Sequence, residues 1–100
     1  MTANESGELL LEVIKGKDAQ QVLTQVQQFR DGMKDTTVGA DYVVWITEPA
    51  NLTRVHKALA EDLEVPHRVL AIRRVLMSRT QKAVSLVTAM EMAIKKVHKI

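Results

Sequence analysis

The 100-residue chain has no cysteine. It therefore has no disulfide framework, no thiolate metal site and no cysteine nucleophile, and its composition fits a reducing compartment. Its longest uninterrupted apolar runs are four or five residues, whereas about 20 are needed to span a bilayer. The first residues, MTANESGE, are polar and acidic, unlike the basic and then apolar start of a secretory signal. These absences predict a soluble, cytoplasmic protein with no membrane partner.

Residues that could carry catalysis or hold a metal are few and scattered. The three histidines are His56, His67 and His98, and only His67, with Glu64, has a second ligand at the spacing of a helical metal site. No serine lies in a Gly-x-Ser-x-Gly context, and no glycine-rich phosphate loop is present. Because no nucleophile, base and orienting group occur together, the sequence predicts a non-enzymatic protein without a metal or cofactor.

Aromatic residues are also scarce, with three in the chain. Two of them, Tyr42 and Trp45, lie in the segment DYVVWIT. In a strand they would point to opposite faces, and an exposed aromatic on a sheet could stack an RNA base. The segment lacks a basic and aromatic RNA-binding consensus, so we favour a core role for this pair.

What the chain does contain is typical of one globular domain. Apolar residues make up 46% and charged residues 26% of the sequence, as expected for a folded protein rather than a disordered tail. One hundred residues suffice for a single core and leave no room for a second domain. We expect a flexible N-terminus over residues 1–7 and one domain over residues 8–100.

Periodicity and turn residues predict seven elements. In chain order these are a strand over 9–14, a helix from Asp18 to near Gly32, a short strand at 36–38, a strand over 41–47, a helix capped by Asn51, a strand over 67–77 and a long helix from about Thr80. The first helix has a start like a capping box, Asp18 with Gln21, and an apolar face. Residues 67–77 are ambiguous, because their apolar positions fit both a strand and a helical face.

This order of elements matches two architectures. The first is an α+β, ferredoxin-like split β-α-β sandwich with an added C-terminal helix, in which two helices cover a four-stranded antiparallel sheet. The alternative omits the short strand at 36–38 and gives a three-stranded α/β sheet of alternating strands and helices. We expect the ferredoxin-like arrangement.

Charge is divided unequally along the chain. Residues 1–50 carry 4 basic and 8 acidic side chains, whereas residues 51–100 carry 10 basic and 4 acidic. Part of the basic excess, residues 95–99, is explained by the negative end of a helix dipole. The rest forms a candidate binding patch for a nucleic acid or an acidic partner, since arginine pairs well with oxyanions; its members are Arg68, Arg73, Arg74, Arg79 and Lys82. On a strand, this patch would divide between two faces.

The C-terminal helix has a wider apolar arc than packing on one small sheet requires. Either it covers the open face of the sheet, or it meets a second copy or a partner helix. The residues predicted for such an interface are Val87, Met90, Ile94 and Val97.

Residues 42–80, YVVWITEPANLTRVHKALAEDLEVPHRVLAIRRVLMSRT, resemble the second half of the ribosomal protein S-six family. That family has a strand that starts with an aromatic residue, then a helix and a closing hydrophobic strand with arginines. The positions that fit this pattern are Tyr42, Val43, Val44, Trp45, Leu59, Leu63, Val65, Val69 and Leu70. The resemblance implies a ferredoxin-like fold that binds ribosomal RNA beside a protein partner.

Two functions are compatible with these features. One is a protein-interaction or assembly module, a homo-oligomer or a partner-binding protein, that uses its C-terminal helix and basic patch. The other is an RNA-binding, ribosome-associated protein that uses the arginines. A net charge of only +2 argues against strong nonspecific affinity for nucleic acid, so we place the protein-interaction function first.

Overall fold

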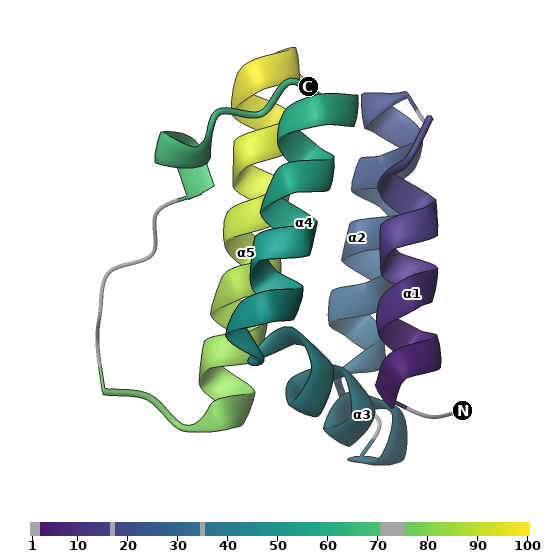
Figure 1. Ribbon diagram of the computed structural model, residues 1–100, viewed down its shortest axis with the longest axis vertical. Helices are drawn as coiled ribbons and strands as arrows, with labels where there is room; N and C mark the ends of the chain where they lie inside the picture. The colour runs from purple at the N-terminus through teal and green to yellow at the C-terminus, as the bar shows by residue number, and fades with distance from the viewer. Residues whose placement is uncertain (1–2, 17, 35, 71–75) are drawn as a thin grey trace.

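The computed structural model describes residues 3–16, 18–34, 36–70 and 76–100. Within these residues the elements are α1 (Ala3–Ile14), α2 (Ala19–Gly32), α3 (Thr36–Ile46), α4 (Pro49–Asp62), the 3-10 helix η1 (His67–Leu70) and α5 (Arg79–His98). Helices α1, α2, α4 and α5 lie along a common direction, and α3 crosses one end of them (Figure 1). Helix α2 runs opposite to the other three, and α5 packs mainly against α2 and α3.

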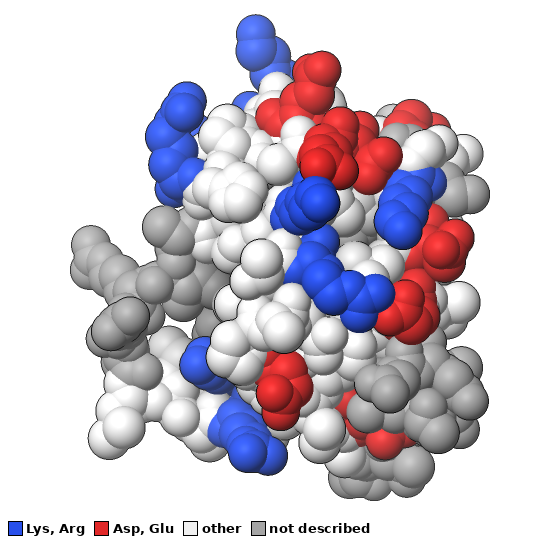
Figure 2. Space-filling model, viewed as in Figure 1, with Lys and Arg blue, Asp and Glu red and all other residues white. Residues whose placement is uncertain are grey.

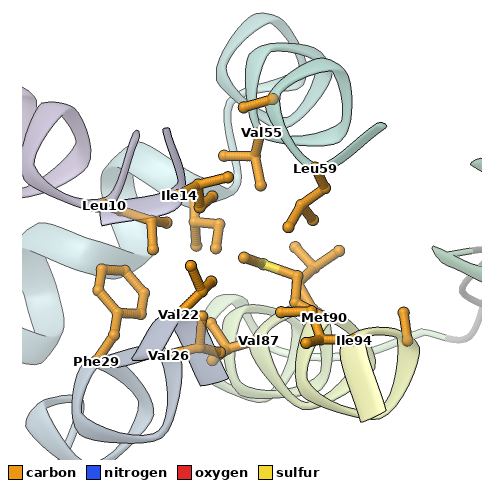
Figure 3. Close-up of a cluster of buried hydrophobic side chains, with 14 of the residues drawn as sticks. Leu10, Ile14, Val22, Val26, Phe29, Val55, Leu59, Val87, Met90 and Ile94 are labelled. Carbon is orange, nitrogen blue, oxygen red and sulfur yellow. The ribbon is translucent and has the colours of Figure 1, made fainter. Parts of the chain in front are cut away.

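The core lies between the four aligned helices, where aliphatic side chains and one phenyl ring converge (Figure 3). The side chains labelled there are Leu10, Ile14, Val22, Val26, Phe29, Val55, Leu59, Val87, Met90 and Ile94. Trp45 of α3 is 2% exposed and packs beside Gly7 of α1, where an added Cβ would overlap the indole ring. A glycine at this position therefore lets α1 and α3 approach closely.

The predicted fold class is wrong, because the described residues contain helices and no strand. Neither the ferredoxin-like sandwich nor the three-stranded alternative exists in them, and the described residues within 42–80 form none of the strands that the ribosomal-protein resemblance implied. Residues 9–14, predicted as a strand, belong to α1. Gly7, Leu10, Leu11 and Ile14 recur at three and four residues and are buried, whereas Glu8 is exposed, which is helical periodicity.

The strands predicted at residues 36–38 and 41–47 are also wrong, because both segments belong to α3 or to the turn after it. The β-branched and aromatic residues of DYVVWIT favour a strand only weakly, and burial overrides that preference. Val43, Trp45 and Ile46 are buried among the surrounding helices. Their burial on a helix that contacts α1, α4 and α5 decides the conformation.

The three predicted helices are confirmed. At the start of α2, the Asp18 carboxylate accepts bonds from the backbone N–H groups of Gln20 and Gln21, at 3.0 and 3.1 Å. Helix α4 begins earlier than expected, with Glu48 as its N-cap, while the predicted cap, Asn51, donates its side-chain amide to the Trp45 carbonyl at 3.1 Å. In each of these helices the buried residues recur at helical spacing, as Val22, Val26 and Phe29 do in α2.

The strand predicted over residues 67–77 is not formed by the residues that can be compared. Its first four residues form η1, and Leu76 and Met77 are exposed coil before the Ser78 cap of α5. Residues 71–75 lie outside the described part of the chain. The helical alternative at the start of this segment was therefore the better one.

Candidate interaction surface

The predicted basic patch is divided in the structure. Arg68 is exposed on η1, near the end of the bundle where α4 stops, whereas Arg79 and Lys82 are exposed at the start of α5, at the opposite end (Figure 1). Arg73 and Arg74 lie outside the described residues. The structure thus brings together only Arg79 and Lys82 among the three basic residues that it describes.

The predicted interface on the C-terminal helix is largely occupied by the chain's own core. Val87 and Ile94 are fully buried, Met90 is 2% exposed, and Val97 packs partly buried against the same cluster. The wide apolar arc of α5 is explained by its position, because α2, α3 and η1 all pack on it. The large apolar side chain that α5 leaves exposed in the described structure is Met92.

An open groove lies where α3 crosses the end of α2 and the start of α5. Its volume is about 400 Å³, and its lining residues are Met33, Lys34, Gly39, Ala40, Val43, Val44, Arg79 and Thr80. We call this surface the α3–α5 groove. Gly39 sits against the end of α2, where an added Cβ would overlap the Met33 carbonyl. Glycine at 39 therefore lets α3 approach the end of α2 closely, and the groove beside it is lined by Ala40 and by Val44, which is 48% exposed.

Positive charge borders this groove. Lys34 and Arg79 come from two different parts of the chain, and of the described lining residues none is acidic. Lys34 also lies 3.8 Å from the exposed Asp31 carboxylate, a long pair of little energetic weight. Arg79 and Lys82 stand at the N-terminal end of α5, where the helix dipole already favours negative charge. A carboxylate in the groove would therefore be stabilised by the charges of Lys34 and Arg79 and by the N-terminal end of α5.

By contrast, the face with α4 in front shows interleaved charges (Figure 2). Acidic side chains gather near the end of α4, where Glu61 and Asp62 are exposed, and basic ones lie among and below them. Arg54 donates to the Glu8 carboxylate at 2.6 Å, and Lys57 lies 4.0 Å from Glu61. Mixed, exposed pairs of this kind are typical of a solvated surface.

Glu91 of α5 is the one buried charged residue among the described residues, at 7% exposure. Its carboxylate accepts a bond from the Gln27 amide at 2.9 Å, pairs with Arg30 of α2 and lies 3.2 Å from the Lys95 ammonium. Burial raises the pKa of Glu91, but these hydrogen bonds and the charges of Arg30 and Lys95 outweigh it and lower the pKa below its ordinary value. Gln27 and Arg30 belong to α2, so these contacts link α5 to α2.

The histidines are closer together than their sequence separation indicates. The rings of His56 on α4 and His67 on η1 lie 5.8 Å apart, edge to face, and His98 is 2.6 Å from the Leu63 carbonyl. Burial, and then the charge of His67, lower the pKa of His56. Within the described part of the chain, His, Asp and Glu side chains form no group of three that could hold a metal ion.

Sequence reasoning missed the groove because it assigned residues 36–38 and 41–47 to strands. The available signal was the helical spacing of Gly39, Ala40, Val43 and Val44, in which two small residues precede two valines by four positions. That spacing becomes a hollow only where α3 meets Met33 and Lys34 at the end of α2 and the first turn of α5.

No family model, no curated protein and no solved structure matches the chain. Across the described residues, no helix has both the length and the apolar character needed to cross a membrane.

Proposed function

We propose that this chain is a non-enzymatic protein-interaction module and that a partner protein binds in the α3–α5 groove. The observation that carries the proposal is an open hollow of about 400 Å³ with aliphatic walls. Met33, Val43 and the half-exposed Val44 form those walls. Covering such a hollow removes apolar surface from water, which is the main source of affinity in protein association.

The proposed function belongs to the class expected from the sequence, but the binding surface is the α3–α5 groove instead of the predicted interface on α5. Two of the predicted basic residues, Arg79 and Lys82, remain at or beside the site. Because Val87, Met90 and Ile94 are in the core, the contribution of α5 to binding comes from its first turn instead of its middle. A cysteine-free chain is suited to a reducing compartment, and we place the module in the cytoplasm as part of the same proposal.

Site-specific photocrosslinking in cells tests the proposed function. A benzophenone amino acid replaces Val44 on the groove wall, and the control carries it at the exposed Gln20, at the other end of α2. We expect discrete crosslinked protein species from position 44 that are missing from position 20. Equal patterns from both positions, or no crosslink from position 44, would contradict the proposal.

A pair of substitutions in the groove sharpens this test. Ala40→Glu and Ala40→Gln fill the hollow with side chains of nearly equal size, but only the glutamate can pair with Lys34 or Arg79. Both variants should weaken crosslinking from position 44, and Ala40→Glu should weaken it more. Unchanged crosslinking in both variants would place the partner elsewhere on the chain.

A further inference from the structure

We infer that the α3–α5 groove takes a single short, acidic amphipathic helix from another protein. This inference rests on the proposed function and names the chemistry of the partner. The α3–α5 groove is small. Eight of the described residues line the groove, whereas a stable interface between two folded proteins uses about 20–30 residues on each side. The groove therefore suits one inserted segment better than a second folded copy of this chain.

The groove suits a helical segment better than an extended one. An extended peptide gains affinity by adding a strand to an open sheet edge. The described residues offer no sheet, so a peptide bound in extended form would leave its backbone groups without a ladder. A helix satisfies its own backbone and presents side chains at positions i, i+3, i+4 and i+7 to a hydrophobic groove. Helical binding is therefore the favoured mode.

The basic residues at the groove favour an acidic segment. Lys34 and Arg79 border the groove, and Lys82 lies one helical turn beyond Arg79. Carboxylates flanking the apolar side chains of an inserted helix would reach these cations, and the N-terminal end of α5 adds to the positive potential. A basic segment would be repelled by the same groups, so charge selects an acidic one.

The lining also distinguishes a protein segment from nucleic acid. Proteins that bind single-stranded RNA or DNA stack the bases on aromatic side chains. Among the described residues that line the groove, the large uncharged side chains are those of Met33, Val43 and Val44, and none is aromatic. The basic groups described near it, Lys34, Arg79 and Lys82, supply few phosphate contacts. A phosphate backbone would leave the valines and the methionine uncovered, whereas an amphipathic helix covers them.

The test uses the full-length protein and labelled helical peptides of about 16 residues, a length that populates helix when docked. The acidic peptide has leucines at i, i+3, i+4 and i+7 with flanking glutamates. One control replaces every glutamate with glutamine, and another keeps the composition but scrambles the leucines. Fluorescence anisotropy gives the affinities. We expect the acidic peptide to bind about tenfold more tightly than the glutamine peptide, because each of two ion pairs at the rim contributes about threefold.

Protein variants locate the binding site. Arg79→Gln should weaken the acidic peptide about threefold, the effect of one such ion pair. The matched control Lys96→Gln removes an exposed charge near the far end of α5 and should leave the affinity unchanged. Circular dichroism confirms that each variant remains helical. Equal loss in both variants, or equal affinity for the acidic and glutamine peptides, would overturn the inference.

Two further outcomes separate this inference from the proposed function. If single-stranded RNA displaces the acidic peptide and binds with a steep salt dependence, or if the crosslink from position 44 joins two copies of this chain, the acidic-helix inference fails. If the acidic peptide does not bind while crosslinks from position 44 persist, the inference also fails but the proposed function stands. If those crosslinks are missing, both fail.

Discussion

At the scale of single residues, Glu91 shows how this small core keeps a buried carboxylate charged. Its partners Gln27 and Arg30 lie on α2, 64 and 61 residues away in sequence. Only Lys95, four residues along the same helix, was within reach of a local pattern. The sequence therefore identifies the apolar face of α5. The partners that stabilise the buried Glu91 carboxylate lie on α2, and their proximity depends on how α2 and α5 pack together.

We predict that Glu91→Gln lowers the free energy of unfolding at pH 7 by about 1–3 kcal/mol, because the partners lose a charge-assisted acceptor but can partly rehydrate. A lowered pKa means that the stabilisation is complete above the ordinary value of 4.5 and is lost as the pH falls through the folded-state pKa. The variant should therefore be less sensitive to acid below about pH 4.5. Urea unfolding across pH 2–7 measures both effects.

The control for this experiment is Glu61→Gln. Glu61 belongs to an exposed pair at 4.0 Å, which is worth little in water. A loss in Glu91→Gln no larger than in this control would show that the buried cluster does not hold α2 and α5 together.

Gly7 gives a second test at this scale. Alanine at an interior helix position is ordinarily about 1 kcal/mol better than glycine, so propensity alone predicts that Gly7→Ala stabilises the chain. The structure predicts the reverse, because the new Cβ would overlap the buried Trp45 ring, and overpacking costs about 1–3 kcal/mol. Urea unfolding decides the sign. Trp45→Phe should reduce the penalty of Gly7→Ala, and additive effects would argue against contact.

At the scale of elements, long periodic segments were predictable and short apolar ones were not. Helices α2, α4 and α5 have an apolar stripe with polar residues between, and two of them have side-chain caps. Helices α1 and α3 contain brief runs, LLLEVI and YVVWI, that periodicity cannot assign. Leucine and β-branched residues are compatible with either conformation, so the surrounding helices determine it.

The contact between α4 and η1 predicts a pH dependence. The pKa of His56 is lowered by burial and then by His67, so the unfolded chain binds a proton more readily than the folded one. Stability should therefore decrease as the pH falls below about 6.5, and the loss should be complete below the lowered folded-state pKa. His67→Gln removes the charge but not the burial, and should raise the pKa of His56 only part of the way.

Titration of the histidine ring protons by NMR measures this effect. An unchanged His56 pKa in His67→Gln would contradict the contact with η1, and a His56 that titrates at or above 6.5 would contradict its burial.

At the scale of the whole molecule, the position of α3 determines the proposed function. Helices α1 to α5 all contribute buried side chains to the core, and α3 closes one end of the bundle by crossing over it (Figure 1). Its buried side holds Trp45 and Ile46, while Ala40 and the half-exposed Val44 are left to line the groove with Arg79. The groove could not be inferred from sequence, because it is formed by residues 33–34, 39–40, 43–44 and 79–80 meeting at one end.

The account depends most on the helical conformation of residues 41–46. Backbone NMR assignment of the full chain gives the Cα chemical shifts of these residues relative to their random-coil values. Helix α3 predicts downfield shifts throughout this segment, continuous with those of residues 39–40. Upfield shifts over residues 41–46 would mean a strand, and would remove both the crossing helix and the groove that it forms.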